Sequence, residues 1–403
     1  MALRTKVGSF VGQNDTNNQS ITGVGFKPKA LFLWYDHSTA DGDATNAQLG
    51  LGMAVSATQR AAIWSISDDA EATSDSLRRQ TNLKCISACL VDTTLVAEAD
   101  FVSFDGDGFT IDWTTASATV YNYLAIGGDD LTHAFLKEIT TPASTGAQAS
   151  TGVGFKPDCI IFMCCFNGAT LPVNNAVARL SLGFASGPGA QGCIGSEQRD
   201  GTAAADTFYA HTTTEIIRQP TAAFTPLGAD LTSFDADGFT LDWNAAEANN
   251  IVFALCLKGG KFKVGEIAQP TAAGAQTTGG IGFKPSALLL FSANNATDSL
   301  VAAEMKFSVG AASSPANQSS IVMADKDAAD PMQTDRRMSR TKIISMLTAG
   351  TPTLDADAAL ASFGPGSFTL NWTNADATAR LLMYLAMGGR EAPIGVKRVM
   401  RRW

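Results

Sequence analysis

Side chains suited to acid–base chemistry are scarce in this chain. It has three histidines, His37, His133 and His211, and histidine is the usual general base near neutral pH. The stretch "GFASG" has no serine at the nucleophile position of a hydrolase elbow, and no phosphate-binding glycine loop with a lysine is present. Carboxylates are scattered, so the sequence alone does not show whether two of them lie as close as a glycosidase requires. We expect no enzymatic activity and no cofactor.

Cysteine and aspartate offer two possible metal sites, and we expect neither to bind metal. The chain has seven cysteines, an odd number that does not suggest a disulfide framework. This favours free thiols in a reducing compartment. Asp105 with Asp107, and Asp235 with Asp237, resemble a fragment of a calcium loop, but the further ligands of such a loop are missing. The third occurrence of this stretch reads "GPGS". A hairpin turn therefore explains all three stretches better than calcium does.

The stretches that recur are the strongest signal in the sequence. "GFKP" occurs three times, with its phenylalanine at Phe26, Phe155 and Phe283, which are 129 and 128 positions apart. The run "GFTIDW" returns as "GFTLDW" and "SFTLNW", ending at Trp113, Trp243 and Trp372. A third mark, "YLAIGG", returns as "ALCLKGG" and "YLAMGG". A period of this length is a whole domain and not a solenoid unit. No histidine recurs at an equivalent place.

Each copy consists of short apolar stretches separated by Gly, Asn, Asp, Ser and Thr. Seven or eight such stretches predict an all-β fold of three tandem β-sandwich, jelly-roll-like domains. In "FTIDW", Phe109, Ile111 and Trp113 alternate with polar residues and so face one side of a strand. We therefore predict that Trp113, Trp243 and Trp372 are core residues and not sugar-stacking platforms.

The "GFKP" motif predicts a tight turn followed by a strand. Its glycines allow left-handed backbone, its phenylalanine anchors the turn, and its proline fits the beginning of a strand. The positions are Gly25, Phe26, Pro28, Gly154, Phe155, Pro157, Gly282, Phe283 and Pro285. The residues that follow are continuously apolar, as in a strand covered on both faces. Either a neighbouring copy or chain, or a loop or short helix, would cover the second face.

We predict domains at residues 1–130, 131–260 and 261–390, followed by a basic tail at 391–403. Each third is expected to close its own two-layer core. The short links between copies predict that the units touch, in either a pseudo-threefold block or an extended rod. The tail carries Lys397, Arg398, Val399, Arg401, Arg402 and Trp403. It is either a solvated end or a docking arm for an acidic partner surface.

Charge restricts the class of partner. The chain has 38 Asp and Glu against 29 Lys and Arg, which disfavours a nucleic-acid or anionic-membrane partner. The amino-terminal residues lack the apolar segment of a signal peptide, and the apolar runs are too short to span a bilayer. We expect no nucleic-acid binding and no membrane insertion.

"QSITGVGFKPKALFLW" resembles a repeat of structural proteins from tailed bacteriophages, and the later "GFT…W" stretch is also similar. These short motifs cover about a fifth of the chain and leave the middle of each unit unmatched. The resemblance implies a virion protein, made in the host cytoplasm and associated with the tail, baseplate or fibres. Its partners would be other virion proteins, further copies of itself, or a host-surface glycan. The alternatives are a capsid decoration protein, a receptor- or glycan-binding module, or, least favoured, an enzyme acting on cell-surface polymer.

Overall fold

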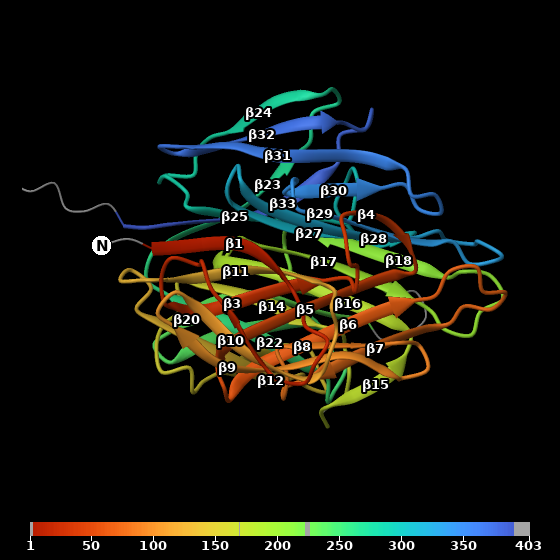
Figure 1. Ribbon diagram of the computed structural model, residues 1–403, viewed down its shortest axis with the longest axis horizontal. Coiled ribbons are helices and arrows are strands. Elements are labelled where there is room, and N and C mark those ends of the chain that lie inside the picture. Colours follow the sequence, from red (N-terminus) through yellow and green to blue (C-terminus); the bar gives the residue numbers. More distant parts are fainter. Residues whose placement is uncertain (1–2, 169, 222–225, 391–403) are drawn as a thin grey trace, which may run out of the picture.

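The structure is a computed structural model that describes residues 3–168, 170–221 and 226–390. Every regular element among these residues is a β-strand, so the predicted all-β class is confirmed. Within the described ranges no helix has the length and apolarity needed to cross a bilayer. The strands form three seven-stranded and three four-stranded sheets (Figure 1).

The strands follow one another in the same order in each third of the chain. The first third contains β1 (Leu3–Val11), β2 (Asn18–Ile21), β3 (Pro28–Tyr35), β4 (Gly42–Thr45), β5 (Ala47–Ser56), β6 (Gln59–Ser67), β7 (Ser76–Thr81), β8 (Ile86–Cys89), β9 (Leu95–Asp105), β10 (Gly108–Thr115) and β11 (Val120–Gly128). The second contains β12 (His133–Thr140), β13 (Gly146–Ser150), β14 (Cys159–Cys164), β15 (Val173–Ala176), β16 (Ala178–Gly187), β17 (Ala190–Gln198), β18 (Thr207–Thr212), β19 (Ile217–Gln219), β20 (Leu227–Asp235), β21 (Gly238–Ala245) and β22 (Ile251–Lys258). The third contains β23 (Lys261–Ala268), β24 (Gly274–Thr278), β25 (Ala287–Ser292), β26 (Ser299–Ala303), β27 (Met305–Ser314), β28 (Asn317–Asp325), β29 (Thr334–Ser339), β30 (Ile344–Leu347), β31 (Leu354–Gly364), β32 (Ser367–Asn374) and β33 (Leu381–Gly388).

The seven-stranded sheets exchange one strand around a closed cycle. The first sheet has the order β1-β11-β3-β5-β6-β7-β15, so its last strand comes from the second third. The second sheet ends with β26 from the third third, and the third sheet ends with β4 from the first. Because the last unit returns to the first, the exchange closes within one chain. We call the pairs β7–β15, β18–β26 and β29–β4 the first, second and third joints.

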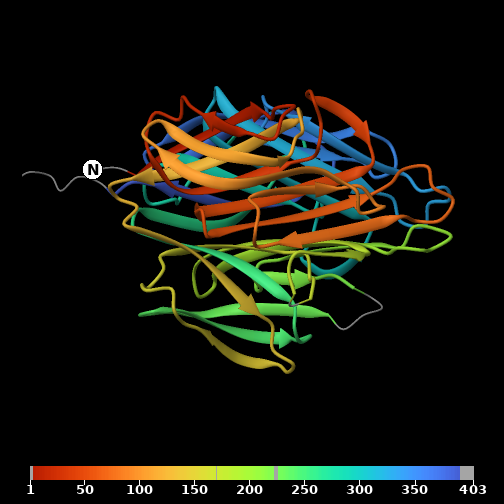
Figure 2. The same cartoon turned by 60° about the horizontal axis from the view of Figure 1, so that its bottom comes forward.

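A four-stranded sheet packs on one face of each seven-stranded sheet and encloses a sandwich core. In the first unit this core joins Leu31 and Leu33 of β3 to Phe101, Phe109 and Trp113 of the four-stranded sheet β2-β10-β9-β8. Equivalent clusters form in the other two units. The four-stranded sheets lie toward the outside: β24, β31 and β32 are at the top of Figure 1, and yellow to green strands of the second third lie at the bottom of Figure 2.

The other face of the seven-stranded sheets contributes to one core shared by all three units. Phe32 and Trp34 of β3 belong to this shared core, whereas Leu31 and Leu33, on the opposite face, belong to the sandwich core. The rings of Phe184 and Phe291, from different units, lie 4.4 Å apart between centroids. The prediction that these strands are covered on both faces is therefore confirmed, and neighbouring units provide the second cover.

The shared core also corrects one expectation. Each third encloses a sandwich core, but it does not contain its whole core, because a further apolar cluster runs through all three. The ranges 1–130, 131–260 and 261–390 stay a prediction as domains, and the exchanged strands cross these boundaries. Sequence periodicity did not reveal the shared core because alternation within one strand does not identify the segment that covers it.

The two links and both ends of the described chain meet at one place. A side chain added at Gly260 would lie 3.2 Å from the carbonyl oxygen of Gly388 and 3.3 Å from Leu3. The backbone N–H of Arg390 donates a hydrogen bond of 2.7 Å to the carboxylate of Asp130. The predicted contact between units is thus confirmed, and the units form a compact block and not a rod.

Candidate functional site

The recurring "GFKP" turns are tied to the recurring aspartate hairpins. Asp107 accepts hydrogen bonds from the backbone N–H groups of Gly23, at 3.1 Å, and Gly25. Asp237 does the same for Gly152, at 3.0 Å, and Gly154, at 2.6 Å. These bonds lower the pKa of Asp237, since N–H donors stabilise the ionised carboxylate.

The other aspartate of each hairpin also has a structural role. Asp105 accepts hydrogen bonds from Ser103 and Thr110, both at 2.7 Å. β9 ends at Asp105 and β10 begins at Gly108, so the predicted hairpin is confirmed. In the third unit, where Gly366 replaces Asp107, only the backbone bond from Ile281 to the Gly366 carbonyl, at 3.1 Å, is recorded across this contact. An equivalent backbone bond joins the two motifs in the first and second units, from Val24 to Asp107 and from Val153 to Asp237, so the motifs are in contact in all three units.

The phenylalanine of each turn is buried and the lysine beside it is exposed. Phe26, Phe155 and Phe283 are between 4% and 7% exposed, whereas Lys27, Lys156 and Lys284 are all exposed. Pro28 opens β3, while Pro157 and Pro285 lie two residues ahead of β14 and β25. The predicted anchoring by phenylalanine is thus confirmed at all three turns.

A hollow of about 510 Å³ lies where the first two turns approach each other. Lys27 and Pro28 line it from the first unit, and Val153, Gly154 and Phe155 line it from the second. The His133 ring lies 5.2 Å from that of Phe155. The turns therefore help to form a recess at a unit boundary as well as supporting their own strands.

The three recurring tryptophans are core residues, as predicted. Trp113, Trp243 and Trp372 are each 1% exposed. Their indole N–H groups donate to the side chains of Gln19 and Gln148, at 2.8 Å, and of Gln276, at 2.9 Å. A buried indole has no free face for a sugar, so these residues do not provide a stacking platform.

Arginines fix the exchanged strand at two of the three joints. At the first joint, Arg78 donates to the carbonyls of Ala176 and Val177, the latter at 2.7 Å. At the third joint, Arg336 donates to the carbonyls of Thr45 and Asn46, the latter at 2.9 Å. Their positions correspond, because Arg78 and Arg336 are the third residues of β7 and β29. A guanidinium group supplies several donors in a fixed plane, which suits carbonyls left at a strand end.

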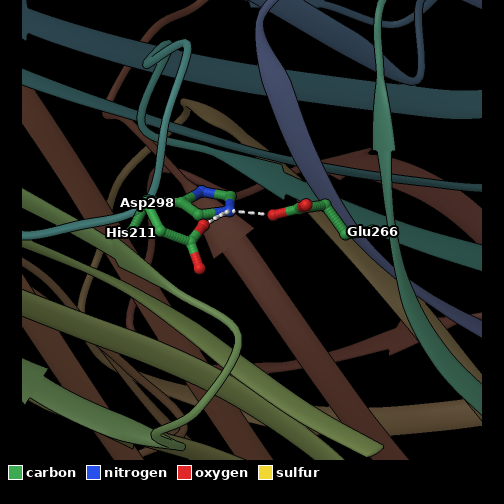
Figure 3. A group of neighbouring side chains, drawn as sticks. All are labelled: His211, Glu266 and Asp298. Carbon is green, nitrogen blue, oxygen red and sulfur yellow. Dashed lines mark hydrogen bonds and ion pairs between the residues drawn. The ribbon is translucent and has the colours of Figure 1, made fainter.

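The second joint has a different set of polar residues. Tyr209 takes the place of the arginine as third residue of β18, and two positions later His211 is fully buried. The Nε2 atom of His211 lies 2.8 Å from Oε1 of Glu266 and 3.7 Å from Oδ1 of Asp298 (Figure 3). These three atoms lie within 4.8 Å of one another. The second and third units thus bring one imidazole and two carboxylates together.

Sequence reasoning missed this group because its members are far apart along the chain. The only signal in the sequence was His211, which lies in a polar stretch that was not predicted to be a strand. No spacing rule connects residues 211, 266 and 298. Of the other histidines, His37 lies 11 positions after Phe26 and has left-handed backbone with a φ of 60°. Phe166 and Asn294 lie at the same offset of 11 positions from Phe155 and Phe283, and both have a φ of 54°. That offset marks a recurring backbone bend and not a recurring base.

Several buried carboxylates have a neighbouring arginine within their own unit. Arg179 lies 2.9 Å from Glu197, and Arg79 lies 2.6 Å from Glu98. Burial raises the pKa of Glu197, although Arg179 acts to lower it. Arg179 and Glu197 link the neighbouring strands β16 and β17, whereas Arg79 and Glu98 link the seven-stranded sheet to the four-stranded sheet of the first unit. Both pairs therefore have a structural role.

The cysteines are all buried and free. Burial raises the pKa of the Cys85 and Cys165 thiols to about 12. Such thiols are poor nucleophiles and poor metal ligands. The predicted docking residues of the tail, Lys397, Arg398, Val399, Arg401, Arg402 and Trp403, lie outside the described residues.

Comparisons with known proteins do not assign a family. No protein-family profile and no curated protein matches the chain. Among solved structures, a fructofuranosidase from Schwanniomyces occidentalis complexed with fructose is similar over 94% of this chain and 98% of its own, at 7% identity and a TM-score of 0.13. A GH32 β-fructofuranosidase from Bombyx mori is similar over 92% and 96%, at 8% identity and a TM-score of 0.14. TM-scores of this size do not indicate a shared fold.

Proposed function

We propose that this chain is a structural protein of a bacteriophage virion, which binds other virion proteins in the tail, the baseplate or a fibre. The observation that carries the proposal is the cyclic exchange of strands, in which β15, β26 and β4 each complete the sheet of another unit. Such an arrangement gives one chain the organisation of a closed trimer. A rigid block of this kind suits an assembly in which the surfaces bind neighbours.

The recurring surface features support a role in assembly. The exposed Lys27, Lys156 and Lys284 occupy the same position in three turns, so one chain presents the same feature three times. Several equivalent contacts to a symmetric partner raise the overall affinity without any single contact being strong. The resemblance of the "ITGVGFKP" stretch to phage structural proteins is a separate line of support for the same role.

Two other binding roles remain alternatives. A capsid decoration protein would use the same block on the head of the particle, and a receptor- or glycan-binding module would use it on the host surface. The burial of Trp113, Trp243 and Trp372 leaves a glycan without the most evident aromatic platform. An enzyme acting on cell-surface polymer is the least favoured reading, because the buried carboxylates with arginine neighbours already have structural partners.

The proposal is tested by asking whether the chain belongs to the particle. Phage particles that carry the gene would be purified on a density gradient, and their proteins quantified by mass spectrometry. We expect the chain in fixed copy number with the tail proteins. Its absence from infectious particles would contradict the proposal, while co-purification with tailless heads would favour a decoration protein. A glycan array with the purified chain separates the receptor-binding alternative.

A further inference from the structure

We propose that His211, Glu266 and Asp298 bind one divalent transition-metal ion of the zinc, cobalt and nickel class at the second joint. The three side chains contribute one nitrogen and two carboxylate oxygens, all within 4.8 Å of one another. Imidazole combined with carboxylate suits this class of ion better than magnesium or calcium, which prefer oxygen ligands alone.

The distances are close to those of a metal centre. Around an ion with bonds of about 2.0–2.2 Å, ligand atoms lie about 3.0–3.5 Å apart. His211 Nε2 is 2.8 Å from Glu266 Oε1 and 3.7 Å from Asp298 Oδ1. The carboxylate side chains are 29% and 44% exposed, so small side-chain rotations suffice to place all three atoms around one ion. Solvent can fill the remaining coordination positions.

Charge balance favours a divalent ion over a simple hydrogen bond. Apart from His211, no cationic side chain forms a recorded ion pair with Glu266 or Asp298 among the described residues. The Nε2 atom of His211 can donate a hydrogen bond to only one of the two carboxylates, so the other carboxylate lies close by without that bond. An ion with two positive charges balances both carboxylates.

The surroundings hold one ligand in place. The Oδ2 atom of Asp298 accepts a hydrogen bond of 3.0 Å from the Thr213 hydroxyl, which leaves Oδ1 directed toward His211 (Figure 3). Outer contacts of this kind orient metal ligands. His211 itself is held in β18 by pairing with Ser299 of β26 and Ile194 of β17.

The other two joints lack this combination. Gln80 and Met338 are the fifth residues of β7 and β29, as His211 is of β18. By strand register, Glu138 and Ser9 correspond to Glu266. The position equivalent to Asp298 is found from a residue with left-handed backbone that recurs in each unit. This residue is Glu304, Val177 or Asn46, with φ values of 73°, 72° and 66°, and Asp298 lies six positions before Glu304. Six positions before Val177 and Asn46 lie Leu171, at the first joint, and Ala40, at the third. Only the second joint therefore has all three ligands.

An ion at this place would connect the exchanged strand to the sheet that it completes. His211 belongs to β18 of the second unit, Asp298 directly precedes β26 of the third, and Glu266 lies on β23 of the third. Metal binding would therefore stabilise the second joint directly. The other two joints would depend on strand pairing and, as described above, on Arg78 and Arg336.

The test is a zinc titration of the full chain, prepared free of metal, followed by calorimetry and thermal unfolding. We expect one zinc ion per chain and a rise in the melting temperature. Asp298→Ala and Glu266→Ser, which install the residues of the third joint, should weaken zinc binding at least about 10-fold, and His211→Gln should abolish it. Because the two carboxylates are partly exposed, their variants should fold even if His211→Gln does not.

Matched controls separate this site from other histidines and acids. His133→Gln and Glu138→Gln should leave zinc binding unchanged. Cobalt should give visible d–d absorption in the unmodified chain without the charge-transfer band of a thiolate ligand. The proposal would be overturned by no zinc binding to the unmodified chain, by unchanged binding in Asp298→Ala and Glu266→Ser, or by a thiolate band.

Discussion

Asp43 on β4 forms an ion pair of 2.7 Å with Arg337 on β29, although the two residues are 294 positions apart. This contact joins the beginning of the chain to its last unit. β4 would otherwise have no sheet to enter, since its pairing partner is β29. The ion pair therefore marks the joint at which the cycle of exchanged strands closes.

Removing Arg336 should weaken this closing joint strongly. Its guanidinium donates to the carbonyls of Thr45 and Asn46 and lies 3.8 Å from the fully buried Asp36. Arg336→Ala leaves that carboxylate without its cation, and we expect a loss of about 3 kcal/mol in the free energy of unfolding. Chemical denaturation measures the loss. Arg340→Ala removes a more exposed pair with Asp41 and should cost at most about 1 kcal/mol. Equal losses in the two variants would contradict the account.

The third joint should also respond to pH through Asp335. Burial, together with the negative charges of Asp69 and Asp43, raises the pKa of Asp335 to about 6. The folded state therefore favours the protonated carboxyl. The stability that the protonated Asp335 contributes is complete below the unfolded pKa of about 4. It is lost as the pH rises through the folded pKa of about 6. Asp335→Asn should thus stabilise the protein above pH 6 and have little effect below pH 4, as measured by melting temperature against pH.

Asp376 provides a control of opposite sign for that pH series. Burial acts to raise its pKa, but hydrogen bonds from Thr378 and Arg380 outweigh burial and lower it. Its stabilisation is present above the unfolded pKa and is lost as the pH falls through the folded pKa. Asp376→Asn should therefore destabilise the protein at neutral pH. If both variants shifted the melting temperature in the same direction at pH 7, the assignment would be wrong.

The third turn offers a test by gain of an interaction. Gly366 stands where Asp107 and Asp237 hold the other two turns, and an added side chain would meet only the backbone nitrogen of Gly282, at 3.9 Å. Gly366→Asp should accept hydrogen bonds from Gly280 and Gly282 and add about 1 kcal/mol of stability. Thermal unfolding measures the gain. Gly366→Ala controls for the loss of glycine flexibility, and an equal gain with alanine would show that the carboxylate has no role.

The thiols should be unreactive in the folded chain. All seven cysteines are buried, and burial raises the pKa of Cys89 to about 12. We expect Ellman's reagent to modify no cysteine in native buffer and all seven in guanidinium chloride. Rapid reaction of one thiol in native buffer would show that the core around it opens readily.

The basic tail should be needed for assembly and not for folding. Deleting residues 394–403 should leave the melting temperature unchanged. If the tail is a docking arm for an acidic partner surface and not a solvated end, the deletion should abolish incorporation into particles. Complementation of a phage lacking the gene, followed by gradient purification, measures incorporation. A deletion mutant that enters particles normally would leave the tail without this role.

The apolar strands could be predicted from the sequence, whereas the exchanged strands could not. In the first unit, the apolar stretches of the sequence correspond to eight strands: β1, β3, β5, β6, β8, β9, β10 and β11. The three missed strands were β2, β4 and β7, in which polar residues predominate. β4 reads "GDAT", a composition typical of a loop. It is a strand because it pairs with β29 of another unit. Propensity within one segment does not report a partner nearly 300 residues away.

The candidate metal group shows the same limitation. Trp113 could be assigned to the core because alternation fixes its side of the strand. His211 could not be joined to Glu266 and Asp298, because only the fold of two units brings them together. The repeats do predict equivalent positions, so the absence of this group from the other two joints follows directly once the register is known.

The most direct test of the proposed function is a cryo-EM map of the intact particle. We predict density for the closed three-unit block in the tail, baseplate or fibre, with β4 seated beside β29 and the outer surfaces in contact with other virion proteins. A complete map in which every density is explained by other proteins would contradict the account.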